Sequence, residues 1–386
     1  MRCATALTSD EDAQRAGRSL IEQLRNRLGA EPSAVVLFAG PNYEHKELLD
    51  EIAKGSDAPL IGASSAGEFV NQTQGDGLAC ALGLFGDDVS FTASVSRGLR
   101  DHPARAARDL VKQFRGLQQS AAKPHRAALV MTDALAGHAD VLVEEMTLAT
   151  SGRYQFFGGG AGDNAQFKRT SVFCGTEVLD DAAVALELLT EKPLGIGVQH
   201  GWTPASPPLR VSEVEGNLLI GLNGFPAIAA FETHAKASGQ NFDRNDPIAF
   251  FLHNVIGIET GAGYRIRVPL AIQNDGSIAC ASEIPRSSIV HIMKASRTST
   301  TEAAEAAVKS ALRAMGGHKP GAALFFDCVA TRLRMGQAFE DELAGVRKYL
   351  AGAEMMGCNT HGQIARAPGQ FEGFHNCTAV VCLLPG

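Results

Sequence analysis

The 386-residue sequence has no excess of basic residues and no long apolar run. Lys and Arg number 35 against 42 Asp and Glu, which gives a formal net charge of -7. A nucleic-acid partner would require a basic face, and anionic membrane surfaces also attract basic segments, so both kinds of partner are disfavoured. No stretch approaches the ~20 apolar residues of a membrane span. The start at Met1 shows no hydrophobic signal-peptide core, so we expect a cytoplasmic protein.

Cysteine pairs with metal-site spacing are also missing. The eight cysteines include no Cys-x-x-Cys pair, and most of them lie in apolar runs such as 278–281 and 380–383. A free cysteine behaves as a small buried hydrophobe, so we expect core thiols and not disulfides or zinc ligands.

Familiar catalytic and nucleotide-binding motifs do not occur either. The chain contains no Gly-x-Gly-x-x-Gly, no phosphate loop, no Gly-x-Ser-x-Gly elbow and no His-Glu-x-x-His. We therefore expect a protein that is not an enzyme.

One structural unit is predicted three times along the chain. Each copy has a strand and an amphipathic helix, a buried strand, a second helix, a glycine-rich element and a closing strand. The opening strands are predicted at 3–7, 89–95 and 288–294, and the buried strands at 34–38, 127–131 and 322–326. Helix crossovers favour parallel neighbours, whereas a final hairpin is antiparallel. The predicted fold class is α/β, with repeated strand-helix-strand-helix-strand-strand units forming mixed sheets covered by helices.

The chain is too long for one ordinary core, so two domains are expected. We place the boundary near 205, in a proline-rich segment at 202–208. The first domain, 1–205, holds two units, 1–87 and 88–200. The second domain, 206–386, holds an irregular insertion, 206–287, and the third unit, 288–386. We expect the residues that determine ligand specificity in this irregular insertion, because the rest of the scaffold is repetitive.

The glycine-rich elements resemble those of FIST domain proteins. Residues 62–68 resemble the N-domain pattern Gly-x-Ser-x-x-Gly-Glu, and 158–163 look like its Gly-Gly-x-Ala-Gly-Asp element. Residues 360–363 and 375–378 are similar to the closing elements of the C domain, although Gln363 stands where the family commonly has Glu. The resemblance covers almost the whole chain and predicts a FIST N domain followed by a FIST C domain.

The resemblance implies a ligand-binding sensor of signal transduction. Stand-alone members of this length resemble haem-binding nitric-oxide sensors that regulate a partner histidine kinase, so haem is the implied cofactor. One alternative is a haem-free sensor of a small metabolite or amino acid, and another is an enzyme on an uncharacterised scaffold. Unpaired edge strands make a homodimer plausible.

Histidine is the natural axial ligand if haem binds. We prefer His234, which ends a predicted helix in an apolar setting, and then His253; His200 is a further candidate. Arg267 lies in an apolar strand, where its guanidinium needs a haem propionate, a ligand carboxylate or a structural acid. For each histidine, an ordinary structural role is the competing interpretation.

The glycine elements provide a second candidate site. Glycine allows close approach of a backbone to a ligand, and successive N–H groups can bind an anion, but tight turns at strand ends would equally require glycine. Glu68 and Asp163 could contact a ligand amine or cap neighbouring backbone N–H groups. The predicted ligand-binding positions are Gly62, Ser64, Gly67, Glu68, Gly158, Gly162, Asp163, Gly362, His375 and Asn376.

Overall fold

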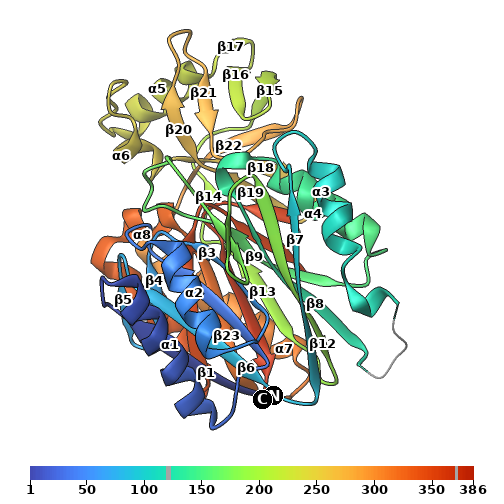
Figure 1. The fold of residues 1–386 in the computed structure, drawn as a ribbon. Coiled ribbons are helices and arrows are strands. Elements are labelled where there is room, and N and C mark those ends of the chain that lie inside the picture. The colour runs from blue at the N-terminus through green and yellow to red at the C-terminus, as the bar shows by residue number, and fades with distance from the viewer. Residues whose placement is uncertain (119–122, 370–372) are drawn as a thin grey trace.

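The structure is a computed structural model that describes residues 1–118, 123–369 and 373–386 (Figure 1). Three six-stranded sheets form the body of the molecule, and a nine-stranded sheet lies beyond one end of them. Strands in the six-stranded sheets pair both parallel and antiparallel, as β2 (Ala34–Ala39) does with β3 (Leu60–Ser64) and β6 (Ala79–Phe85). The predicted α/β class with mixed sheets covered by helices is confirmed.

The first unit and the second unit have the same order of elements. The first unit consists of β1 (Arg2–Thr8), α1 (Ala13–Leu28), β2, α2 (His45–Gly55), β3, β4 (Glu68–Val70), β5 (Thr73–Gly75) and β6. The second unit consists of β7 (Val89–Arg97), α3 (Pro103–Val111), β8 (His125–Thr132), α4 (Ala139–Ala149), β9 (Gln155–Gly160), β10 (Val172–Cys174), β11 (Glu177–Leu179) and β12 (Ala182–Thr190).

The third unit is interrupted by the insertion, which spans 200–296 in the structure. The third unit consists of β13 (Gly195–Gln199), α7 (Arg297–Ala314), β23 (Pro320–Cys328), α8 (Val329–Met335), α9 (Phe339–Arg347), β24 (Glu354–Thr360), β25 (Gln363–Arg366), β26 (Gly373–His375) and β27 (Ala379–Pro385). The expectation that 288–294 opens this unit is wrong. That segment is β22 (Ile289–Lys294) of the nine-stranded sheet, whereas β13 pairs with β27 in the position that β1 and β7 occupy in their sheets.

The insertion forms its own sheet and small core. Its remaining elements are β14 (Thr203–Pro204), β15 (Leu209–Glu215), β16 (Leu218–Leu222), β17 (Phe225–Pro226), α5 (Ala227–Ser238), α6 (Ile248–Phe251), β18 (Val255–Thr260), β19 (Gly263–Arg267), β20 (Pro269–Ile272) and β21 (Ile278–Cys280). Phe231, Phe250 and Phe251 are buried in this core. The insertion lies at the top of the view in Figure 1, away from both chain termini.

The three units exchange their hairpins in a cycle. The strand orders are β1-β6-β2-β3-β10-β11, β7-β12-β8-β9-β25-β26 and β13-β27-β23-β24-β4-β5. The first unit therefore gives its hairpin β4–β5 to the third sheet, the second gives β10–β11 to the first sheet, and the third gives β25–β26 to the second sheet. This pseudo-threefold exchange makes each sheet dependent on two units.

Backbone hydrogen bonds join the crossing segments where the three sheets meet. Ala66 donates its N–H to Asn359 O at 2.9 Å, and Gly162 donates to Ser64 O at 2.8 Å. His361 completes the ring by donating to Gly160 O at 3.1 Å. Each bond links two different units, so this ring holds the centre of the exchange together.

The inner faces of the three sheets share one hydrophobic core. Val36, Leu129 and Leu324, one from each unit, are all at most 1% exposed in it. Phe38 and Phe326 contact edge-to-face with their centroids 5.7 Å apart. The unalternating apolar runs of these strands predict burial on both faces. The structure agrees, because the inner faces pack in this core and helices cover the outer faces.

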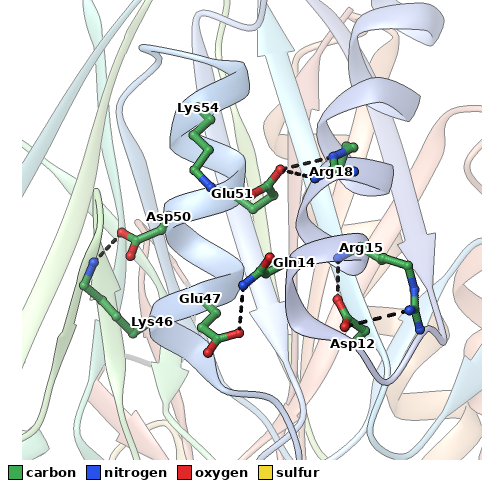
Figure 2. Close-up of polar contacts among 9 residues, drawn as sticks. All are labelled: Asp12, Gln14, Arg15, Arg18, Lys46, Glu47, Asp50, Glu51 and Lys54. Atoms are coloured by element: carbon green, nitrogen blue, oxygen red, sulfur yellow. Dashed lines mark hydrogen bonds and ion pairs between the residues drawn. The ribbon is translucent and has the colours of Figure 1, made fainter.

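Helices α1 and α2 show how an outer face is covered (Figure 2). Gly17 allows the two helices to approach closely, because an added Cβ would lie 2.7 Å from Leu48 O. At the edge of this contact, the largely buried Glu51 of α2 accepts hydrogen bonds from Arg18 of α1 and from Lys54, and Gln14 donates to Glu47. The apolar faces pack inward, and these polar contacts join the solvent-facing sides.

Candidate ligand-binding cavity

A cavity of about 400 Å³ lies where the second unit, the insertion and the third unit meet. This volume is within the usual range for small-molecule sites. Its lining residues are Ala134, Leu135, Ala136, Gly137, His138, Ala139, Asp140, Phe167, Gly216, Asn217, Val268, Leu270, Cys280, Ala281, Ser282, Glu283, Cys328, Val329, Ala330, His361, Phe374 and Asn376. The lining is mainly apolar, with a small number of polar side chains, as in most ligand sites.

His361 is a buried ionisable group in the third unit's part of the lining. Its side chain is 4% exposed, and neither ring nitrogen makes a hydrogen bond within the described residues. Asp163 Oδ1 lies 3.5 Å from Nε2, and the Phe167 ring stacks on the imidazole with centroids 4.8 Å apart. Burial lowers the pKa of His361, and the negative charge of Asp163 opposes this shift. A buried, unsatisfied imidazole at a cavity wall is suited to contact a ligand.

Asp163 fixes the loop that carries Phe167. Its carboxylate accepts backbone N–H bonds from Phe167 at 3.0 Å, Lys168 at 2.7 Å and Arg169 at 3.1 Å. Phe167 itself has a φ of 52°, a left-handed conformation that is costly for a bulky residue. Asp163 therefore has the turn-capping role that was one of its two predicted interpretations, and it also lies beside His361.

Asp140, in another part of the cavity wall, belongs to an ion pair with a buried arginine. Arg267 of β19 is 1% exposed, and its Nη2 lies 2.8 Å from Asp140 Oδ2 in the first turn of α4. It also donates to Glu283 O at 2.8 Å and to Phe374 O at 3.1 Å. Arg265 approaches Asp140 Oδ1 at 3.6 Å. Asp140 is thus the acidic partner that Arg267 requires, and these contacts tie the insertion to the second and third units.

Further polar groups of the cavity come from the insertion and from β26 onward. Ser282 donates to Asn376 Oδ1 at 3.4 Å, and Asn217 donates to Cys280 O at 2.9 Å. Glu283, whose side chain is 46% exposed, lies 3.3 Å from His138 Nδ1 at the outer part of the cavity. Asn376 is the predicted ligand-binding residue that lines this cavity.

The predicted glycine positions are explained by packing of the strands. An added Cβ on Gly62 would lie 1.9 Å from Leu37 O, and one on Gly158 would lie 2.0 Å from Val130 O. Gly67 and Gly362, with φ of 130° and 118°, occupy equivalent turns into the exchanged hairpins. These four glycines do not line the cavity. The structure places them at the junction between units.

The other predicted ligand residues are also placed at this junction. Ser64 Oγ accepts from Ser171 N at 3.0 Å. Glu68 is fully buried and accepts from Ser65 Oγ at 2.5 Å and Leu78 N at 2.9 Å. Burial raises the pKa of Glu68 to about 7. Gly162 belongs to the central ring of hydrogen bonds, and His375 is buried in β26 beside Gln363.

The histidines predicted for haem have different surroundings. His234 Nε2 is within 3.1 Å of Asn254 Oδ1, His253 is exposed, and His200 Nε2 is 2.8 Å from Tyr264 O. None of the three lines the cavity, and Arg267 is engaged by Asp140. Among the described residues, no three His, Cys, Asp or Glu side chains are grouped as a metal site requires.

His361, Asp140, Ser282 and Glu283 were missed as site residues by reasoning from the sequence. His361 stands inside the segment 360–363 that was recognised, so its presence there was the available signal. The other three became relevant only because the insertion folds against α4.

Comparison with known families agrees with this architecture. A model of the FIST N domain matches residues 33–224, and a model of the FIST C domain matches residues 230–366. No curated protein matches the chain. Within the described residues, no helix is both long and apolar enough to cross a membrane.

Proposed function

The chain belongs to the FIST domain proteins, which are ligand-binding sensors of signal transduction, and on that premise we propose that it senses a small polar metabolite without haem. The observation that carries the proposal is the cavity of about 400 Å³, whose wall contains the buried and unsatisfied imidazole of His361. An amino acid or another metabolite of similar size matches both this volume and the few polar groups of the lining.

The residues available for haem support this choice. An axial histidine must present a free ring nitrogen to an apolar slot. His234 uses Nε2 in a contact with Asn254, and His253 faces solvent. The cavity instead contains Asp140, Glu283, Ser282 and Asn376, which suit a polar ligand better than a porphyrin.

Three separate parts of the chain form the walls of this cavity. The start of α4 belongs to the second unit, residues 268–283 to the insertion, and His361 to the third unit. A ligand that contacts all three stabilises one relative placement of the insertion and the body. We propose that a signalling partner, such as a histidine kinase, reads this placement, and that no catalytic turnover is involved.

Binding can be tested with a cavity-filling variant. We would measure the thermal midpoint of the protein against a panel of amino acids and small organic acids, and then repeat the series with Ala281→Phe. Ala281 lines the cavity, so the larger side chain should abolish the rise in midpoint. Ala237→Phe, on the exposed side of α5, is the matched control and should respond as the unchanged protein does. An equal response of the Ala281 variant would place the ligand elsewhere.

A further inference from the structure

We infer that the cavity anchors its ligand by a carboxylate group, held between the His361 ring and the first turn of α4. This inference rests on the proposed function, since it names the chemical class that the same cavity takes. Two independent features of the cavity favour an anionic ligand, and the charges of the lining favour one class of anion over another.

The first feature is the unsatisfied ring of His361. Its side chain is 4% exposed, it lines the cavity, and both of its nitrogens are without a hydrogen bond among the described residues. A buried polar group without a hydrogen bond is costly, and an acceptor supplied by a ligand would remove this cost. Since an imidazolium has two N–H donors, a carboxylate oxygen is a suitable acceptor.

The second feature is the start of α4, an 11-residue helix. The N-cap residue His138 adopts a φ of 57°, and its side chain makes no capping hydrogen bond. The next residues, Ala139 and Asp140, line the cavity. The first-turn N–H groups of a helix carry a partial positive charge and favour a bound anion.

Both features face the same cavity. His361, Ala139 and Asp140 all line it, together with residues 134–138, which lead into α4. Phe167 stacks on the His361 ring and also lines the cavity. One ligand in the cavity can therefore contact both features.

The charges around this wall favour a carboxylate over a phosphate. The lining contains no lysine or arginine within the described residues, and it contains two acids, Asp140 and Glu283. Asp140 is balanced by Arg267 and Arg265 behind the wall. A phosphate dianion would lack the cationic side chains that it normally requires, and Asp163 already lies 3.5 Å from His361 Nε2, whereas a carboxylate brings only one negative charge to the wall.

Binding of a carboxylate should take up a proton. The titratable groups that face His361 or line the same cavity are Asp163, Asp140, Glu283 and His138. Burial lowers the pKa of His361, so the empty cavity favours the neutral ring at neutral pH. A bound carboxylate stabilises the protonated ring, and its affinity should therefore rise as the pH is lowered.

The test uses the full-length protein and acid–amide pairs. Common amino acids and short monocarboxylic acids would be titrated calorimetrically, each beside the amide of the same skeleton. The acids should bind at least ~10-fold more tightly than the amides, because a charged hydrogen bond contributes about 1.5–3 kcal/mol. His361→Asn should remove most of this difference, and His318→Asn, on an exposed turn, should leave it unchanged.

The outcomes separate this inference from the proposed function. Amides that bind as tightly as their acids would overturn the carboxylate anchor and leave the sensor standing. Unchanged acid binding by a folded His361→Asn variant would do the same. If that variant does not fold, the pH series on the unchanged protein decides, because affinity that does not rise at lower pH contradicts the anchor. If neither acids nor amides bind, both proposals fail.

Discussion

Arg267 Nη2 and Asp140 Oδ2 lie 2.8 Å apart and join β19 of the insertion to the first turn of α4. The guanidinium is 2% exposed, so it depends on this carboxylate and on the carbonyl groups of Glu283 and Phe374. The pair is therefore a structural connection between the insertion and the body, and its Asp140 residue also lines the cavity.

Arg267→Met should destabilise the protein by about 3–5 kcal/mol, because it leaves the Asp140 carboxylate partly buried without its closest partner. Urea unfolding would measure the change in the free energy of unfolding. The control is Arg97→Met, which breaks the exposed pair with Glu177 and should cost less than about 1 kcal/mol. If both variants lose the same free energy of unfolding, the Arg267 pair stabilises the protein no more than an exposed ion pair does.

Gly62→Ala should destabilise the protein by about 3 kcal/mol or prevent folding, because the new Cβ would lie 1.9 Å from Leu37 O. Gly261→Ala is the matched control, since a Cβ there meets nothing within 4 Å. Chemical denaturation of both variants would check the expectation. A stable Gly62→Ala protein that has lost ligand binding would instead support the earlier interpretation of this glycine as a ligand contact.

Glu68→Gln should change how stability depends on pH. Burial raises the pKa of Glu68 from 4.5 to about 7, so between these values the folded chain binds more protons than the unfolded chain. The stabilisation from this group is complete below about pH 4.5 and is lost as the pH rises to 7, a loss on the order of 3 kcal/mol. The stability of the variant, compared with the unchanged protein, should therefore increase over this interval. If the difference in the free energy of unfolding between the variant and the unchanged protein is the same at every pH, the raised pKa of Glu68 is contradicted.

Added hemin should bind weakly and without saturation. Titration followed in the Soret region, before and after nitric oxide, would show this directly. His234→Ala should give the same titration, because His234 contacts Asn254 and does not line the cavity. A saturable band near one haem per chain that disappears in this variant would restore the haem-based sensor and reject the haem-free proposal.

The repeated unit could be predicted because it depends on local patterns. The apolar runs at 34–38, 127–131 and 322–326 each form a central strand of a separate sheet, as their composition indicated. The first strand of the third unit was misplaced because β13 and α7 are separated in sequence by the whole insertion. Only pairing with β27 identifies β13 as its equivalent, and pairing partners are not encoded in local periodicity.

The candidate site was less predictable than the fold. Asn376, one of the predicted ligand-binding positions, lines the cavity, and it lies in a recognised segment. His361 was quoted within such a segment without being proposed, because its burial and its lack of hydrogen bonds are properties of the folded chain. Asp140 is an ordinary first-turn acid in the sequence, and it becomes part of a site only because Arg267 reaches it from the insertion.

The cyclic exchange of hairpins restricts how this architecture could have arisen and how it can be altered. A fourth unit cannot be added to this cycle, because each hairpin already pairs in the sheet of another unit and no sheet is left for a further hairpin. The chain also begins and ends at one place, where Lys192 binds Gly386 O and the Met1 amino group binds Asp88 (Figure 1). Joining the termini and opening the chain at an exposed loop should therefore preserve every sheet. Excising any one unit would remove a hairpin from a second sheet and leave the hairpin of the remaining unit unpaired.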